Sequence, residues 1–98
     1  MTSPVRFSPA ALDDLHAAVD WYDAQRSGLG DEFLHSVELC LSRIEQLPRW
    51  FPERGHGVRS ALLRRFPYAV LFRIRADRIE VLALWHWHRA PWGWMARL

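Results

Sequence analysis

The stretch YAVLFRIRADRIEVLALWHW, residues 68–87, decides the fold of this chain. Its two halves, Tyr68–Ile74 and Ile79–Trp87, are rich in branched and aromatic residues, which is typical of β-strands. Ala76 and Asp77 between them predict a tight turn. Val58–Phe66, which precedes this stretch, has a similar composition and predicts one more strand. We therefore expect three consecutive strands that form an antiparallel meander.

The last strand predicts a face for each of its side chains, because successive residues of a strand point to opposite sides of the sheet. One face would carry Ile79, Val81, Ala83, Trp85 and Trp87, and the other Arg78, Glu80, Leu82, Leu84, His86 and His88. Both sets contain large apolar groups, so neither face is plainly a solvent face. A turn at Ala76-Asp77 also places Arg73 opposite Glu80.

The N-terminal half begins with a short β-prone piece, Val5–Phe7, which is followed by the start of a helix. The start is Ser8-Pro9, because serine caps helix N-termini and proline suits the first helical turn. Apolar residues then recur at helical spacing until about Arg26. Helical spacing places most of the acids of this helix on its wet face, out of Asp13, Asp14, Asp20 and Asp23.

A second helix is expected after a break in the chain at Gly28 and Gly30. Its apolar stripe runs from Phe33 to Leu47 and stops before Pro48. The element order is therefore β-α-α-β-β-β. It predicts a single α+β domain over residues 1–98, in which an N-terminal helical hairpin packs on a small twisted antiparallel sheet.

Composition limits the class of protein. The chain has 98 residues, 50% of them hydrophobic and 24% charged, which favours one small globular unit over a disordered segment. Every apolar run is shorter than the roughly 20 residues of a membrane span, and residues 1–7 lack the apolar core of a signal peptide. The lone Cys40 forms no internal disulfide and is expected in the core, which favours a cytoplasmic protein. The sequence predicts no cofactor and no metal site.

The net charge of +2 hides an asymmetry between the two halves. Residues 1–47 hold three Arg and eight acids, a charge of −5, whereas residues 48–98 hold ten Arg and three acids, a charge of +7. Within the basic half, arginine and aromatic residues gather between Leu62 and Trp94. Guanidinium groups bind phosphates and carboxylates, and aromatic rings stack on bases or fill a partner's pockets. We expect a macromolecular contact surface here, on the sheet face or edge that the helices leave open.

Several pieces of the sequence carry a family resemblance. They are Val5-Arg6-Phe7-Ser8-Pro9-Ala10-Ala11 with Asp13-Asp14-Leu15, the pair Trp21-Tyr22, the break Gly28-Leu29-Gly30, the run Leu63–Tyr68, and Ile79–Leu84 followed by His86, Arg89, Pro91 and Trp94. In this order and spacing they resemble the RelE/ParE superfamily of toxins from bacterial type II toxin-antitoxin modules. The resemblance covers nearly the whole sequence.

The resemblance implies a partner. Such toxins have a cognate antitoxin, here a ParD-like ribbon-helix-helix protein whose tail folds as it binds the toxin, and such modules are linked to plasmid stabilisation. An acidic tail would be steered toward the +7 half. The residues expected to contact the antitoxin or the target are Arg65, Tyr68, Arg73, Arg75, Trp87, Arg89, Trp92 and Trp94.

The superfamily has two activities: ParE-like members block DNA gyrase, and RelE-like members cut mRNA on the ribosome. The run Phe66-Pro67-Tyr68 and the spacing from His86 to Trp94 look more like the ParE branch, so gyrase inhibition is the expected function. His88-Arg89-Ala90 departs from the Arg-Arg-Asp that this branch often carries before proline.

Two alternatives stay open. A metal-independent, ribosome-dependent endoribonuclease would use Arg65 and Arg89 for the developing charge, and His86 or His88 for acid-base chemistry. The other alternative is a degenerate, non-toxic member that only binds its antitoxin. The two histidines also fit packing or a hydrogen bond to a partner, whereas a metal site lacks a clear third ligand.

Overall fold

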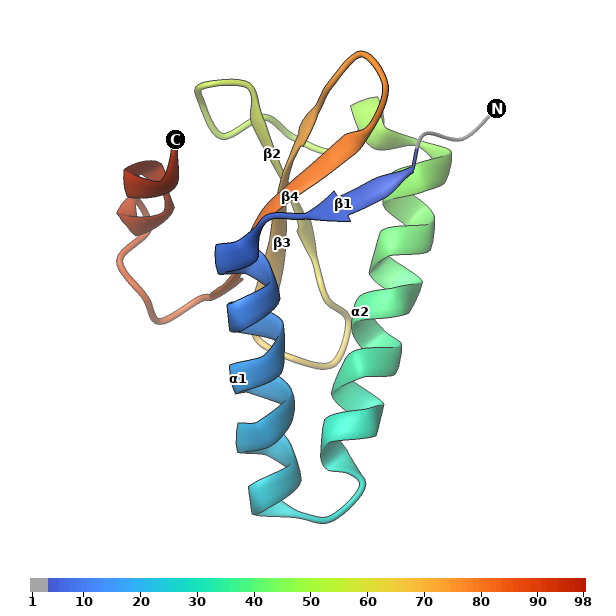
Figure 1. Cartoon of the computed structure of the whole chain (residues 1–98), viewed down its shortest axis with the longest axis vertical. Helices are drawn as coiled ribbons and strands as arrows, with labels where there is room; N and C mark the ends of the chain where they lie inside the picture. The colour runs from blue at the N-terminus through green and yellow to red at the C-terminus, as the bar shows by residue number, and fades with distance from the viewer. Residues whose placement is uncertain (1–3) are drawn as a thin grey trace.

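The computed structural model describes residues 4–98 as two helices and a four-stranded sheet (Figure 1). The elements are β1 (Val5–Phe7), α1 (Pro9–Gln25), α2 (Leu29–Gln46), the 3-10 turn η1 (Pro48–Trp50), β2 (Val58–Leu62), β3 (Tyr68–Ile74), β4 (Ile79–His86) and the 3-10 turn η2 (Gly93–Arg97). Figure 1 shows α1 and α2 as a long antiparallel hairpin, with the sheet across its upper part. No helix within residues 4–98 is both long and apolar enough to cross a membrane.

Side chains fix both ends of α1. The Ser8 Oγ accepts a hydrogen bond from the Ala11 N–H at 3.1 Å, which confirms the predicted cap. After α1, the Asp23 carboxylate accepts hydrogen bonds from the N–H groups of Gly28 and Gly30, at 3.0 and 3.3 Å. Gly28 has a φ of +90°, which a residue with a Cβ rarely adopts. These contacts turn the chain directly into α2.

The sheet order is β1-β4-β3-β2. β3 runs antiparallel to β2 and β4, and the Arg75 N–H donates to the Arg78 carbonyl at 2.8 Å across the turn at Ala76-Asp77. The meander and the α+β class are therefore confirmed. β1 pairs parallel with β4, so the four-stranded sheet is mixed, and the second strand ends at Leu62 rather than Phe66.

A β-bulge in β4 changes which side chains share a face. Phe72 pairs with Val81 and Leu71 pairs with Ala83, which leaves Leu82 between them without a partner. One extra residue exchanges the two faces of a strand from that point on. The expectation that Ile79, Val81, Ala83, Trp85 and Trp87 share one face is therefore wrong. Ile79 and Val81 face the helices, whereas Ala83 and Trp85 face the opposite side.

The sheet consequently separates two apolar cores. The larger core, under the helices, includes Ala11, Phe33, Val37, Ile44, Phe66, Val70, Phe72, Val81 and Leu84. The smaller core lies on the other face of the sheet, called the far face below, and consists of Val58, Ala69, Leu71, Leu82, Ala83, Trp85 and Trp94. Trp94 belongs to η2, so the C-terminal segment folds back and covers part of the face that was expected to be open.

Candidate functional site

An apolar groove crosses the far face beside the C-terminal segment. Its volume is about 340 Å³. It is lined by Arg54, Ser60, Leu62, Ala69, Leu71, Trp85, Trp87, Pro91, Trp92 and Trp94. Trp94 and Trp85 form the buried floor, with 4% and 8% of their surface exposed, whereas Trp87 and Trp92 are 56% and 69% exposed. We call this feature the tryptophan groove. Exposed tryptophans next to a preformed apolar groove are typical of a protein-protein contact.

The C-terminal segment forms this groove because it is fixed to Trp85. The Trp85 Nε1–H donates to the Ala90 carbonyl at 3.1 Å, and the Arg89 guanidinium lies 3.7 Å from the centre of a Trp85 ring. Gly93 lies so close to the Trp85 ring that a Cβ added to the glycine would be 2.6 Å from the Trp85 Cζ2 atom. The short loop from Arg89 to Gly93 therefore brings Trp94 back onto the sheet.

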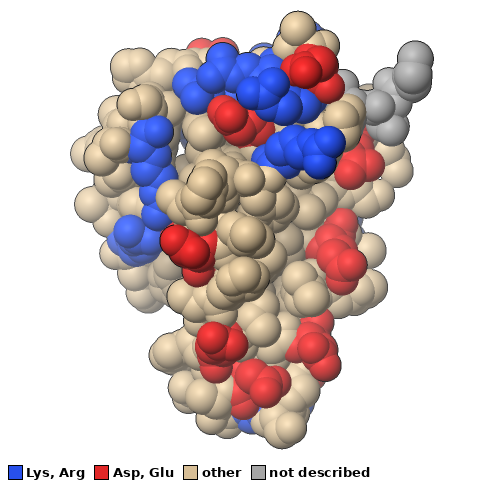
Figure 2. Space-filling model, viewed as in Figure 1, with Lys and Arg blue, Asp and Glu red and all other residues tan. Residues whose placement is uncertain are grey.

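Positive charge gathers at the other end of the sheet, around the β3–β4 turn. Arg73, Arg75 and Arg78 all lie near the Glu80 carboxylate, with N···O distances of 3.2, 3.7 and 3.8 Å. This confirms that Arg73 lies opposite Glu80. We call the four residues the Glu80 cluster. Figure 2 shows basic groups over this end of the molecule and acidic groups along the helices.

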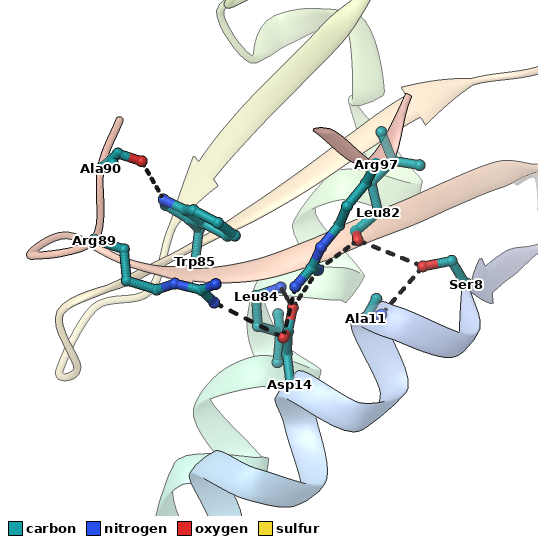
Figure 3. A network of polar contacts seen from close by, with 9 residues as sticks. All are labelled: Ser8, Ala11, Asp14, Leu82, Leu84, Trp85, Arg89, Ala90 and Arg97. Atoms are coloured by element: carbon teal, nitrogen blue, oxygen red, sulfur yellow. Dashed lines mark hydrogen bonds and ion pairs between the residues drawn. The ribbon is translucent and has the colours of Figure 1, made fainter. Parts of the chain in front are cut away.

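The Asp14 carboxylate is the centre of a second polar network (Figure 3). It accepts two hydrogen bonds from Arg97, at 2.6 and 3.0 Å, and a third from the Leu84 N–H at 3.1 Å. Arg89 lies 4.0 Å away. The hydrogen bonds to Asp14 raise the pKa of Arg97, and this guanidinium also donates to the Leu82 carbonyl at the bulge. Helix α1 and the C-terminus are thus joined across β4.

Asp14 departs from the wet face expected for most acids of this helix, because its side chain is only 13% exposed. β1 pairs with β4 only as far as Val81, so beyond that point no strand within residues 4–98 covers the outer edge of β4. Asp14 supplies the missing acceptor for Leu84 there. Its position between the buried Ala11 and Ala18 is the signal in the sequence, since positions 11, 14 and 18 share one helix face.

His86 ends β4 on the helix side of the sheet. Its ring is 5.0 Å from that of Tyr68 and 4.9 Å from that of His88, edge to face in both cases. Burial, followed by the nearby charge of His88, lowers the pKa of His86, so the ring is neutral at pH 7. The Nδ1 atom accepts the His88 backbone N–H at 3.0 Å, which leaves the proton on Nε2.

The predicted site residues lie in separate places. Arg65 is in the β2–β3 loop and pairs with Glu32 of α2 at 2.9 Å. Arg73 and Arg75 belong to the Glu80 cluster, Trp87, Trp92 and Trp94 line the tryptophan groove, and Tyr68, His86 and Arg89 lie near Asp14. The histidines fall short of a metal site, because residues 4–98 contain no group of three side chains able to hold an ion. Asp14, Trp21 and Arg97 were not predicted as site residues.

The chain is similar to known toxins of toxin-antitoxin systems. The family described as the ParE toxin of the type II toxin-antitoxin system parDE matches residues 5–91. A chain of the chromosomal ParDE system from P. aeruginosa has a TM-score of 0.76 at 20% identity, over 87% of this chain and 96% of that one. A chain of the RelBE2 toxin-antitoxin complex from Mycobacterium tuberculosis has a TM-score of 0.61 at 25% identity, over 88% and 99%. A comparison with curated proteins finds no match.

Proposed function

This chain belongs to the ParE toxin family of type II toxin-antitoxin systems, and we propose that it acts in the cytoplasm as an inhibitor of DNA gyrase that a ParD-like antitoxin neutralises. Inhibition of this kind needs a binding surface and no reacting group. RNA cleavage, by contrast, needs a base, cations and an acid around one phosphate.

The hydrogen bonding of His86 is the observation that carries this choice. Of the other candidates, Arg65 is already paired with Glu32 of α2, and Arg89 lies in the loop after β4. Neutral His86 keeps its proton on Nε2, and its other nitrogen is occupied by the His88 N–H. To act as a general base, His86 would have to give up that hydrogen bond or change tautomer. The arrangement therefore favours binding over acid-base catalysis.

The tryptophan groove and the Glu80 cluster support an antitoxin contact on the far face. A tail that folds on binding needs a long surface with apolar anchor points, because it loses conformational entropy when it orders. Trp87 and Trp92 offer exposed apolar surface, Arg73 lies on the same sheet, and Arg75 follows β3 directly. The three arginines outnumber the two carboxylates that pair with them, Glu80 and Asp77, which suits an acidic tail.

Two assays on the purified protein test the function. We expect the protein to inhibit supercoiling by DNA gyrase, and to leave mRNA intact in primer extension from a translating extract. His86→Ala should leave gyrase inhibition unchanged, because inhibition needs no reacting group, whereas Arg65→Ala tests the contact expected between Arg65 and the target. mRNA cuts in phase with codons that vanish in these variants, with supercoiling unaffected, would contradict the proposal and favour the endoribonuclease.

A third result is also informative. If the protein binds its antitoxin but changes neither supercoiling nor mRNA, it is the degenerate, antitoxin-binding member of the family. The antitoxin itself should be found by purification of the intact complex from cells that express the neighbouring reading frames together.

A further inference from the structure

A hollow of about 260 Å³ lies on the helix side of the sheet, between α1 and the unpaired edge of β4. It is separate from the tryptophan groove, which is on the far face. Ala17 and Ala18 of α1 line it, together with Leu84 of β4. Ala18 and Leu84 are almost fully buried and form an apolar floor. The hollow exists because the small side chains of the two consecutive alanines leave space between α1 and β4.

The polar groups that line the hollow are mainly hydrogen-bond donors. Burial, followed by the charges of Tyr22 and Asp14, raises the pKa of Tyr68, so its hydroxyl keeps its proton. His86 is neutral and its Nε2–H is not used by the Nδ1 contact to His88. Arg89 adds a guanidinium that is half exposed and held flat against Trp85. These three side chains come from β3, β4 and the loop after β4.

Acceptors in the hollow are already occupied. The Asp14 carboxylate receives both Arg97 hydrogen bonds and the Leu84 N–H, so Arg97 offsets its charge. Arg89 is farther away, at 4.0 Å. The lining therefore has a surplus of hydrogen-bond donors, and with Arg97 beside it two guanidinium groups lie near the single Asp14 carboxylate, which suits an anion such as a phosphate.

The ring of Trp21 lies beside these hydrogen-bond donors. Trp21 lines the hollow from α1 and is 59% exposed, with its ring perpendicular to that of Tyr22 at 5.0 Å. An exposed tryptophan next to arginine provides a platform on which a nucleobase can stack. The volume, near the lower end of the roughly 300–1,000 Å³ of ligand pockets, suits one nucleotide.

We propose that this hollow binds a single nucleotide, with its phosphate on Arg89, Tyr68 and His86 and its base against Trp21. The nucleotide is either a free nucleoside monophosphate or the phosphorylated end of a nucleic acid strand. Because His86 and Arg89 are also candidate nuclease residues, nucleotide binding is measured separately from mRNA cleavage and from gyrase inhibition.

Calorimetric titration of the purified chain tests the site. We expect AMP to bind about tenfold more tightly than adenosine or inorganic phosphate, because only AMP carries both the ring and the anion. Arg89→Gln and Trp21→Ala should each weaken AMP binding about tenfold, and Tyr68→Phe, which keeps the packed ring, should weaken it less. Arg78→Gln and Trp92→Ala, both outside the hollow, should leave the affinity unchanged.

AMP is then compared with a short oligonucleotide that either carries or lacks a 5′-phosphate. This comparison shows whether the bound nucleotide is free or is the end of a strand. Equal affinity for AMP and the phosphorylated strand supports a free nucleotide, and tighter binding of the phosphorylated strand supports a strand end. Three results would overturn the proposal. The first is that neither probe shows saturable binding, and the second is that Arg89→Gln and Trp21→Ala, with native circular dichroism spectra, bind AMP as tightly as the wild type does. The third is that N-acetylphenylalanine binds more tightly than AMP. The last would indicate a peptide carboxylate as the ligand.

Discussion

Asp14 and Arg97, 83 positions apart in the sequence, are joined by two hydrogen bonds of 2.6 and 3.0 Å. Both side chains are mostly buried, with 13% and 22% of their surface exposed. The pair fixes the C-terminal segment to α1, and the segment in turn covers the smaller core. The position of the C-terminal segment, and with it the shape of the far face, therefore depends in part on the Asp14 carboxylate.

Asp14→Asn should lower the free energy of unfolding by about 2 kcal/mol, because Arg97 would keep its charge in a partly buried place without a counter-ion. Urea denaturation measures this change. Asp13→Asn, on the exposed side of the same helical turn, is the matched control and should change stability by less than about 0.5 kcal/mol. Equal effects of the two variants would show that the pair is not a significant part of the fold.

The lowered pKa of His86 predicts a loss of stability in mild acid. Above its ordinary pKa of 6.5, His86 is neutral in both the folded and the unfolded chain, so its contribution is fully present. Below 6.5 the unfolded chain takes up the proton first, and stability falls until the pH reaches the lowered pKa of the folded state. Unfolding should be measured from about pH 7.5 to about pH 5.

His86→Gln is the control for this pH dependence, because it removes the titrating ring. The variant should lose stability less steeply over the same pH range than the wild type does. NMR of the ring nitrogens should place the proton on Nε2 at neutral pH, and His88→Ala should raise the pKa of His86, since it removes one of the two causes of the shift. An unchanged slope in His86→Gln would argue against the assigned role.

The tryptophans of the far face should separate into two groups when they are truncated. Trp94→Ala should destabilise the protein by about 3–5 kcal/mol, because it empties the smaller core. Trp92→Ala, with a largely exposed ring, should leave stability nearly unchanged and should weaken antitoxin binding by more than about 1 kcal/mol. Denaturation and titration with the purified antitoxin measure the two effects. Full antitoxin affinity in both Trp92→Ala and Trp87→Ala would exclude the tryptophan groove as the contact.

Cys40 should resist alkylation in the folded protein. Its side chain is fully buried, its sulfur lies 3.8 Å from the Ala61 carbonyl, and burial raises the pKa of the thiol. The reactive thiolate is therefore both scarce and inaccessible at pH 7. Iodoacetamide should label the protein at a rate that rises with urea in parallel with unfolding. Rapid labelling without denaturant would contradict the packing described here.

Local patterns were sufficient to predict most elements, because Tyr68–Ile74 and the Ser8-Pro9 helix start each follow from neighbouring residues. The bulge at Leu82 was not predictable in this way. Residues 81–85 are all apolar, so an inserted residue leaves no break in the pattern. Once the bulge is present, every later side chain of β4 changes sides, and the alternation expected for Trp85 and Trp87 refers to the wrong face.

The candidate site, too, could be predicted from local sequence patterns only in part. The sequence predicted the pairing of Arg73 with Glu80, because one tight turn joins their strands, but it did not predict the tryptophan groove or the position of Arg65. Arg65 pairs with Glu32, an acid that is distant in the sequence. Asp14 was missed as a site residue because helical spacing assigned most acids of α1 to a wet face, whereas positions 11, 14 and 18 share a buried face.

The parallel pairing of β1 with β4 has a consequence for synthesis of the chain on the ribosome. β1 is translated well before its partner residues, Ile79 to Val81, with both helices and two strands in between. Contacts this distant along the chain form late in folding. The nascent chain therefore cannot close its sheet until β4 has left the ribosome, and β1 must wait without its partner strand until then.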